Sequence, residues 1–195
     1  LASAAADGPA SDAERPALLL VGDSTLAPRT GYGDALCRQL SPAWACLNLA
    51  KGGRSTLSYR AKGLWQRVLA RLRAGQTGVP RVVLIQFGHN DQPGKPGRST
   101  DLSREFPANL ARYVEEVRSA GGLPLLGTPL TRRSFKGETL QDDLQPWAEA
   151  VRRVAHEQGV PLVDTHAASF ARVQALGEAV ADTLAVAAKP AEGQP

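Results

Sequence analysis

The chain has 195 residues, of which 43% are hydrophobic and 22% are charged. These values are typical of one globular domain. The net charge of +4 is a moderate basic excess, and no apolar run approaches the ~20 residues that a membrane-spanning helix needs. Only 5% of the residues are aromatic, and no nucleic-acid recognition motif occurs, so we expect neither a membrane nor a nucleic acid as partner.

The N-terminal residues 1–16 are rich in Ala, Ser, Asp, Gly and Pro. They show no hydrophobic periodicity that would let a helix or strand bury one of its faces. We interpret them as a mobile leader. The first six residues, LASAAA, resemble the small-residue end of a secretory signal, which predicts a secreted or periplasmic protein. In an oxidising compartment Cys37 and Cys46 could close a short loop between the first helix and the second strand; two buried thiols are the alternative.

From residue 17 onward, short apolar runs alternate with segments of helical period. The predicted strands are 18–21, 46–49, 82–87, 123–126 and 160–163, and the predicted helices are 33–40, 64–73, 103–120 and 144–158. Strands separated by helices indicate crossover units and a parallel sheet. We therefore predict an α/β fold, a three-layer α/β/α sandwich with a parallel sheet of about five strands. Pro161 favours an edge position for the last strand, and residues 131–141 are expected to form a longer loop.

After Asp164 the sequence predicts one more helix over residues 168–188, with a break near Gly177, and then a polar end over residues 189–195. No internal repeat and no second domain are indicated. The predicted organisation is therefore a leader, one domain over residues 17–188, and a short polar end.

Unusual residues follow three of the predicted strands: Gly22-Asp23-Ser24-Thr25, Gly52-Gly53-Arg54-Ser55 and Gly88-His89-Asn90-Asp91. Taken alone, the first of these is more typical of a turn or a helix cap than of a catalytic site. In a parallel sheet, however, the carboxyl ends of the strands share one edge, where ligands bind. We therefore expect the three loops to meet, although they lie far apart in the sequence.

Acyl transfer by a serine needs a nucleophile, hydrogen-bond donors for the oxygen that becomes negative, and a base. Ser24 offers the hydroxyl group. The backbone N–H groups of Ser24 and Gly53 and the side-chain amide of Asn90 are candidate donors, and Gly53 allows close approach because it lacks a Cβ atom. The sequence thus supplies two of the three requirements.

These three blocks resemble the SGNH (GDSL-type) hydrolases, and within that superfamily they look most like rhamnogalacturonan acetylesterases. The resemblance implies a flavodoxin-like sheet and hydrolysis of acetyl esters on carbohydrate, typically pectic polysaccharide. It implies Ser24 as nucleophile and Ser24, Gly53 and Asn90 as the oxyanion hole. Neither a metal nor an organic cofactor is implied, and the sequence contains no nucleotide-binding glycine motif.

The fourth signature of this family, an Asp-x-x-His block near the C-terminus, is missing. The histidines are His89, His156 and His166, and none has an aspartate three residues before it. His166 follows the fifth strand in Asp164-Thr165-His166 and is a weaker candidate for the base. We expect the missing block to follow Pro195 and the 195-residue chain to be nearly inactive. The alternative is a relative that binds carbohydrate without catalysis.

Basic residues surround the predicted loops: Lys51, Arg54, Arg60, Lys62, Lys95, Arg98, Arg132, Arg133 and Lys136. If these loops share an edge, a basic groove there would attract an anionic polymer such as a galacturonate chain. A solvated charged surface is the alternative for each of them. Tyr32, which follows the serine loop, is a candidate for lining the pocket.

Overall fold

The computed structural model describes residues 14–184. The predicted leader up to residue 13, the end of the last predicted helix and the polar end 189–195 lie outside the described residues. The elements in chain order are β1 (Ala17–Gly22), α1 (Gly33–Gln39), β2 (Ala45–Asn48), α2 (Thr56–Ala61), α3 (Leu64–Arg73), β3 (Arg81–Gln86), α4 (Glu105–Ser119), β4 (Leu123–Gly127), β5 (Phe135–Lys136), β6 (Thr139–Leu140), α5 (Gln145–Gln158), β7 (Leu162–Val163) and α6 (Thr165–Asp182).

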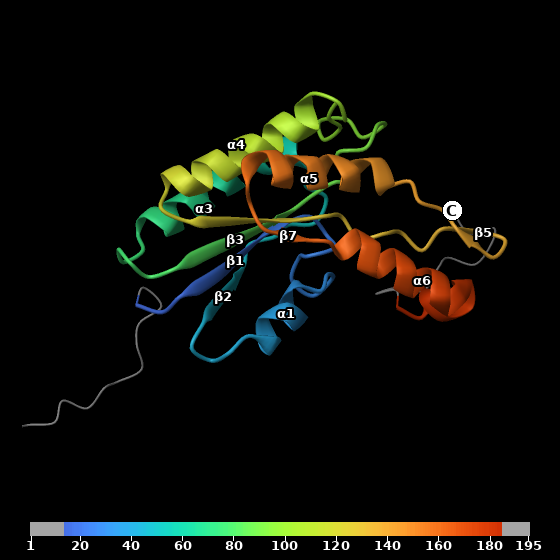
Figure 1. Cartoon of the computed structure of the whole chain (residues 1–195), viewed down its shortest axis with the longest axis horizontal. Coiled ribbons are helices and arrows are strands. Elements are labelled where there is room, and N and C mark those ends of the chain that lie inside the picture. The colour runs from blue at the N-terminus through green and yellow to red at the C-terminus, as the bar shows by residue number, and fades with distance from the viewer. Residues whose placement is uncertain (1–13, 185–195) are drawn as a thin grey trace, which may run out of the picture.

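The central sheet has five strands in the order β2-β1-β3-β4-β7, and all of its pairs are parallel. Helices α3, α4 and α5 cover one face, and α1 lies on the other (Figure 1). The predicted three-layer α/β fold is therefore confirmed, and β7 takes the predicted edge position. The strand order reverses between β1 and β3, and such a switch point opens the crevice in which ligands bind.

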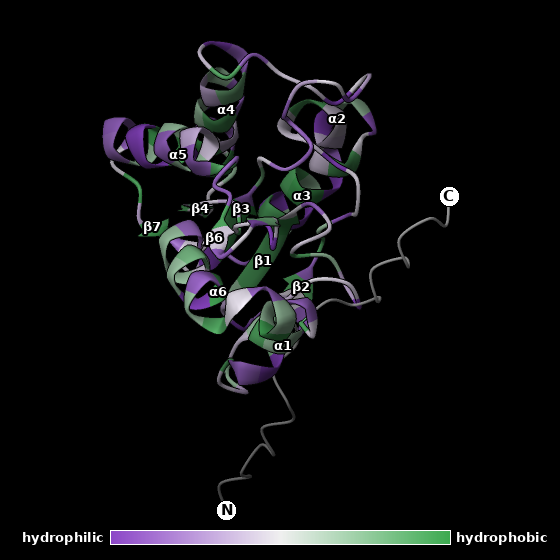
Figure 2. Ribbon diagram, turned by 90° about the vertical axis from the view of Figure 1, so that its right-hand side faces the viewer, coloured by the Kyte–Doolittle hydropathy of each residue, from purple (hydrophilic) through white to green (hydrophobic). Residues whose placement is uncertain are grey.

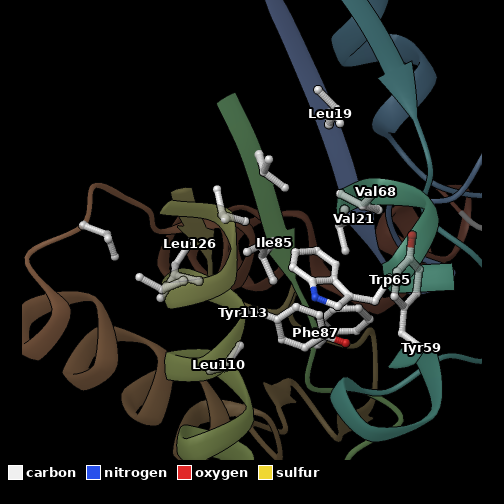
Figure 3. Close-up of a cluster of buried hydrophobic side chains, with 14 of the residues drawn as sticks. Leu19, Val21, Tyr59, Trp65, Val68, Ile85, Phe87, Leu110, Tyr113 and Leu126 are labelled. Carbon is white, nitrogen blue, oxygen red and sulfur yellow. The ribbon is translucent and has the colours of Figure 1, made fainter. Parts of the chain in front are cut away.

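The larger core lies between the sheet and α3, α4 and α5, where aromatic rings pack together (Figure 3). The ring centroids of Trp65 and Tyr113 are 4.5 Å apart, and those of Phe87 and Tyr113 are 5.8 Å apart. Phe87 is fully buried and directly precedes the loop that begins at Gly88. This packing fixes the start of that loop, because the ring has no room to move.

A smaller core lies on the other face, where β1 packs towards α1. Cys37 of α1 and Cys46 of β2 form a disulfide with a Cα–Cα distance of 5.5 Å. The disulfide, one of the two alternatives for these cysteines, therefore ties α1 to an edge strand. No helix within residues 14–184 has both the length and the apolar character needed to cross a bilayer.

Three local features differ from the prediction. Helix α2 was not expected; it has only six residues, too few for a visible period, and is set by a capping box in which Ser55 and Ser58 each bond the other's backbone N–H. Residues 131–141 contain the hairpin β5–β6, which turns at Gly137 with φ of 60°, in the left-handed region that favours glycine.

The third difference concerns α6. It begins at Thr165, three residues earlier than predicted, because the side chain of Asp164 caps it by accepting from the N–H of Ala167. The predicted break at Gly177 is present, with φ of 70° and ψ of 167°. Leu184, just after α6, lines a cavity at the carboxyl edge of the sheet, which is described below.

Candidate active site

Ser24 lies in the turn that follows β1, and a buried aspartate shapes this turn. The carboxylate of Asp23 is fully buried and accepts hydrogen bonds from the N–H and hydroxyl groups of Thr25, at 2.9 and 2.8 Å. Asn48 holds the next part of the loop by donating to the carbonyl of Leu26 at 3.0 Å. The turn therefore buries the residue on one side of Ser24 and leaves Ser24 itself exposed.

The glycine loop after β2 packs directly against Ser24. The N–H of Lys51 donates to the carbonyl of Gly22 at 3.0 Å, and a Cβ atom built on Gly52 would lie 3.8 Å from the Cβ of Ser24. Gly53 has φ of 71°, a value that other residues rarely adopt. Within residues 14–184 the N–H groups of Ser24 and Gly53 donate to no protein acceptor, so both are available to a ligand.

Asn90, in the loop after β3, is held at both ends of its amide group. Its Nδ2 donates to the carbonyl of Arg54 at 3.0 Å, and its Oδ1 accepts from Nη1 of Arg98 at 3.4 Å. An amide nitrogen carries two hydrogens, so one remains for a ligand. These two bonds fix which way the amide faces. A rotated amide would present its nitrogen to the donor Arg98 and its oxygen to the carbonyl oxygen of Arg54, and both bonds would be lost.

Asp91 ties the second loop to the third. Its Oδ1 accepts from the hydroxyl groups of Thr56 and Thr100, at 2.5 and 3.1 Å, and from the N–H of Thr56 at 3.1 Å. Burial raises the pKa of Asp91 to about 7, although the bonds from Thr56 and Thr100 oppose the rise, and the charge of Asp23 adds to it. The two loops are therefore joined through one buried carboxyl group.

The structure thus brings together Ser24, Gly53 and Asn90 at one edge of the sheet, as the sequence predicts for loops after parallel strands. Figure 2 looks towards this edge, with α4 and α5 on one side of the strands and α1 and α6 on the other. The chemical roles of the three residues remain predictions.

A cavity of about 660 Å³ opens beside Ser24; we call it the serine cavity. Tyr32 and His89 line it, and so does Leu184, so the expectation for Tyr32 is met. The hydroxyl of Tyr32 donates to Oε1 of Gln86, and burial raises the pKa of Tyr32. Nδ1 of His89 lies 3.6 Å from Oδ2 of Asp23, and neither atom has a hydrogen-bond partner. The ring of His89 and the carboxylate of Asp23 therefore face each other close to Ser24.

A second cavity of about 410 Å³ opens at Gly53; we call it the glycine cavity. Its lining includes Gly53, Arg54, Ser58, Lys62, Gly97 and Arg98. His89 lines the serine cavity, and Asn90 contacts Arg54 and Arg98, which line the glycine cavity.

The other two histidines do not line the serine cavity. His166 is buried at the start of α6, and its Nε2 lies 2.8 Å from Oδ1 of Asp142, while His156 is exposed on α5. Asp164 is bonded to Arg152, and these bonds lower the pKa of Asp164 to about 2. The structure therefore does not bring His166 to Ser24.

The predicted basic edge is present in part. Arg132 and Arg133 line the serine cavity, and Arg54, Lys62 and Arg98 line the glycine cavity. Including Arg60 in this edge was wrong: its guanidinium group lies over the ring of Tyr113, 4.4 Å from the centroid, and forms a 2.8 Å ion pair with Glu116 of α4. The nearby acid and ring face hold Arg60 away from the loops.

Sequence reasoning missed the contacts between loops: Arg98 on Asn90, Asp23 opposite His89, and Asp91 on Thr56 and Thr100. Each contact joins residues on different loops or at irregular spacing in the sequence. No helical or strand periodicity therefore predicts it. Within residues 14–184 no cluster of three or more His, Cys, Asp or Glu side chains is placed to hold a metal ion.

Comparison with known proteins finds related sequences over most of the chain. It is 31% identical over 183 residues to the rhamnogalacturonan acetylesterase RhgT of Bacillus subtilis, a match that covers 90% of this chain and 75% of that protein. It is 29% identical over 168 residues to the probable rhamnogalacturonan acetylesterase YesY of the same species, over 83% of this chain and 75% of that protein.

Solved structures share the fold. The acetylxylan esterase Axe2 of Geobacillus stearothermophilus matches with a TM-score of 0.64 at 23% identity, over 84% of this chain and 82% of that one. A Bacillus subtilis protein matches with a TM-score of 0.74 at 20% identity, over 87% of this chain and 49% of that one. This chain therefore spans about half the length of the latter protein.

The family model for the GDSL-like lipase/acylhydrolase family matches residues 20–184, a range that contains the three loops and both cavities. The resemblance drawn from the motifs is thereby confirmed. The chain belongs to the GDSL-like lipase/acylhydrolase family of ester hydrolases.

Proposed function

We propose that the protein is a serine esterase that removes acetyl groups from carbohydrate, with acetylated pectic polysaccharide as its substrate. The observation that carries the proposal is the position of exposed Ser24 beside three groups able to donate hydrogen bonds: its own N–H, the N–H of Gly53 and the amide of Asn90. The names of the relatives support the substrate, since two are called rhamnogalacturonan acetylesterases, one of them probable.

In the proposed reaction, Oγ of Ser24 attacks the carbonyl carbon of the acetyl ester and loses its proton to a base. The carbonyl oxygen becomes negative, and the three donors stabilise it by hydrogen bonding. The intermediate collapses, the C–O bond to the sugar breaks, and the sugar hydroxyl leaves with the proton. Water then attacks the acetyl-enzyme, and acetate is released.

We propose that the base comes from an Asp-x-x-His block that follows Pro195. Two observations support this: neither His156 nor His166 lines the serine cavity, and Leu184 near the end of α6 does. Leu184, the last described residue, therefore lies at the same cavity as Ser24. A serine without a base keeps its proton near neutral pH, and donors alone retain only a residual rate.

We also propose that the protein is exported. The Cys37–Cys46 disulfide supports this, because disulfides persist mainly in oxidising compartments. Detection of the protein in the culture medium or periplasm of its source cells tests the proposal, and a purely cytoplasmic signal would contradict it.

The function is tested by acetate release from acetylated rhamnogalacturonan. The assay compares the 195-residue chain, the full product of its reading frame, and the full product with Ser24→Ala or Ser119→Ala. We expect activity in the full product, little in the 195-residue chain, and a loss of about 10⁴-fold or more in Ser24→Ala. Ser119→Ala is the matched control, since Ser119 is exposed at the end of α4.

A serine-directed phosphonate separates the two candidate functions. Covalent capture at Ser24 in the full product supports the esterase. Binding of the polysaccharide with neither labelling nor acetate release would support a carbohydrate-binding protein. Full activity of the 195-residue chain would overturn the proposed source of the base and make His89, the histidine that lines the serine cavity, the first candidate.

A further inference from the structure

The glycine cavity is lined by positive charge. Arg54 from the loop before α2, Lys62 at the end of α2 and Arg98 from the loop after β3 converge on its 410 Å³ volume, and no acidic side chain lines it. A volume of this size lies within the range of ligand-binding pockets. The cavity therefore combines space for a ligand with a charge that selects an anion.

These charges have no acidic partner. Within residues 14–184 none of the three side chains forms an ion pair, and Nε of Arg54 is buried without a hydrogen-bond partner. Arg60, six residues from Arg54, has Glu116 at 2.8 Å. Three like charges around one cavity repel one another, and a buried donor without an acceptor costs free energy. An anion in the cavity would relieve both costs.

The cavity adjoins the proposed ester site. Gly53 is part of its wall, and the Cβ position of neighbouring Gly52 is 3.8 Å from the Cβ of Ser24. Arg98 lies 3.4 Å from Oδ1 of Asn90. One polymer chain can therefore present an acetyl ester to Ser24 and an anionic group to Arg98.

We propose that the glycine cavity is a subsite for the carboxylate of a uronic acid residue, next to the acetylated sugar in the same polysaccharide. The proposal rests on the function proposed above, which supplies a carbohydrate as the ligand. Arginine suits a carboxylate because its planar fork of N–H groups matches the two oxygens. Lys62 adds a point charge at the rim. Through this subsite the enzyme prefers acidic to neutral acetylated polysaccharides.

The test measures binding, and so it does not depend on hydrolysis. Isothermal titration compares trigalacturonate with the same trisaccharide after reduction of its carboxyl groups, on the unaltered chain, Arg98→Gln, Lys62→Gln and Arg71→Gln. Arg71 is an exposed arginine of α3 that lines neither cavity, and it controls for the loss of one charge. Thermal melting confirms that each variant is folded.

We expect the unaltered chain to bind the acid at least about tenfold more tightly than the neutral trisaccharide, which is typical of a charge-assisted pair. Arg98→Gln removes most of this preference, Lys62→Gln lowers it about threefold as for a more exposed charge, and Arg71→Gln leaves it within twofold. Arg98→Lys keeps only part of the preference for the acidic trisaccharide, because lysine lacks the planar fork of N–H groups that arginine presents to a carboxylate.

Any one of four results would overturn the proposal. The acid and neutral trisaccharides could bind equally well, the preference could survive in Arg98→Gln/Lys62→Gln, or it could disappear in Arg133→Gln, which would assign it to the serine cavity. Inorganic phosphate that displaces trigalacturonate at a lower concentration than free galacturonate would identify a site for free phosphate instead. Acetate release is measured separately, so a failure of the proposed esterase function is distinguishable from a failure of the subsite.

Discussion

The two cavities beside Ser24 differ in how far their charged groups are paired. In the serine cavity Arg132 pairs with Asp143 and the ring of His89 faces Asp23, while Arg133 forms no ion pair within residues 14–184 and its Nε is buried without a hydrogen-bond partner. In the glycine cavity Arg54, Lys62 and Arg98 have no acidic partner within the described residues. The paired groups hold the loop after β3 in place, and the three unpaired cations of the glycine cavity are available to a ligand. We therefore propose that the reaction takes place at the serine cavity and that the glycine cavity selects the ligand.

Asn90 lies at the boundary of the two cavities and tests this division most strongly. We expect Asn90→Ala to lower kcat about 10²- to 10³-fold, as the loss of an oxyanion donor does elsewhere, with a much smaller change in KM. Asn90→Asp keeps the shape of the side chain but replaces the donors with a negative charge, and it should lower kcat at least as far. Steady-state kinetics of the full product of the reading frame, on a small neutral acetyl ester, measure both.

A kcat for Asn90→Ala above one tenth of the unaltered value would contradict the assignment. Loss of trigalacturonate binding in Asn90→Ala, with an unchanged kcat, would mean that Asn90 serves the glycine cavity only. The division between the cavities would then have to be redrawn.

Asp91 joins the two walls of the glycine cavity, and its pKa predicts how the joint responds to pH. The carboxyl group stays protonated up to about pH 7 in the folded chain but ionises near pH 4 when unfolded. The unfolded chain therefore binds fewer protons between these values, and the free energy of unfolding falls as pH rises from about 4 to 7. A shift of this size corresponds to a loss on the order of a few kcal/mol.

Urea unfolding at pH 4.5 and pH 7.5 measures this effect. We expect Asp91→Asn, whose amide does not titrate, to lose much less stability over the same range, because the other groups still contribute. The same decline in both proteins would show that other groups cause it. Oligogalacturonate binding at the two pH values then shows whether the joint also shapes the glycine cavity.

Much of this site follows from the sequence, because strand ends are local features. The apolar runs that end at Gly22 and Phe87 predict where Ser24 and Asn90 lie, and the parallel topology brings them together. The division into two cavities does not follow. It depends on the guanidinium group of Arg98 reaching Asn90 and on Glu116 holding Arg60 away, and only the packed tertiary structure decides which of several nearby cations meets which acid.

The disulfide between α1 and β2 provides the smallest expected effect on either cavity. Cys37 and Cys46 enclose a loop with a sequence separation of 9, for which the entropy of the unfolded chain predicts a stabilisation of about 2 to 3 kcal/mol. Cys37→Ser/Cys46→Ser should lower the free energy of unfolding by about this amount and leave both kcat and the preference for the acidic trisaccharide unchanged, since neither residue lines a cavity. Urea unfolding, acetate release and titration measure the three quantities. A drop in kcat alone would mean that α1 holds the serine loop in place through Asp34, whose carboxylate accepts from Asn48 and from the N–H of Arg29, and that the geometry at Ser24 depends on how α1 packs against the sheet.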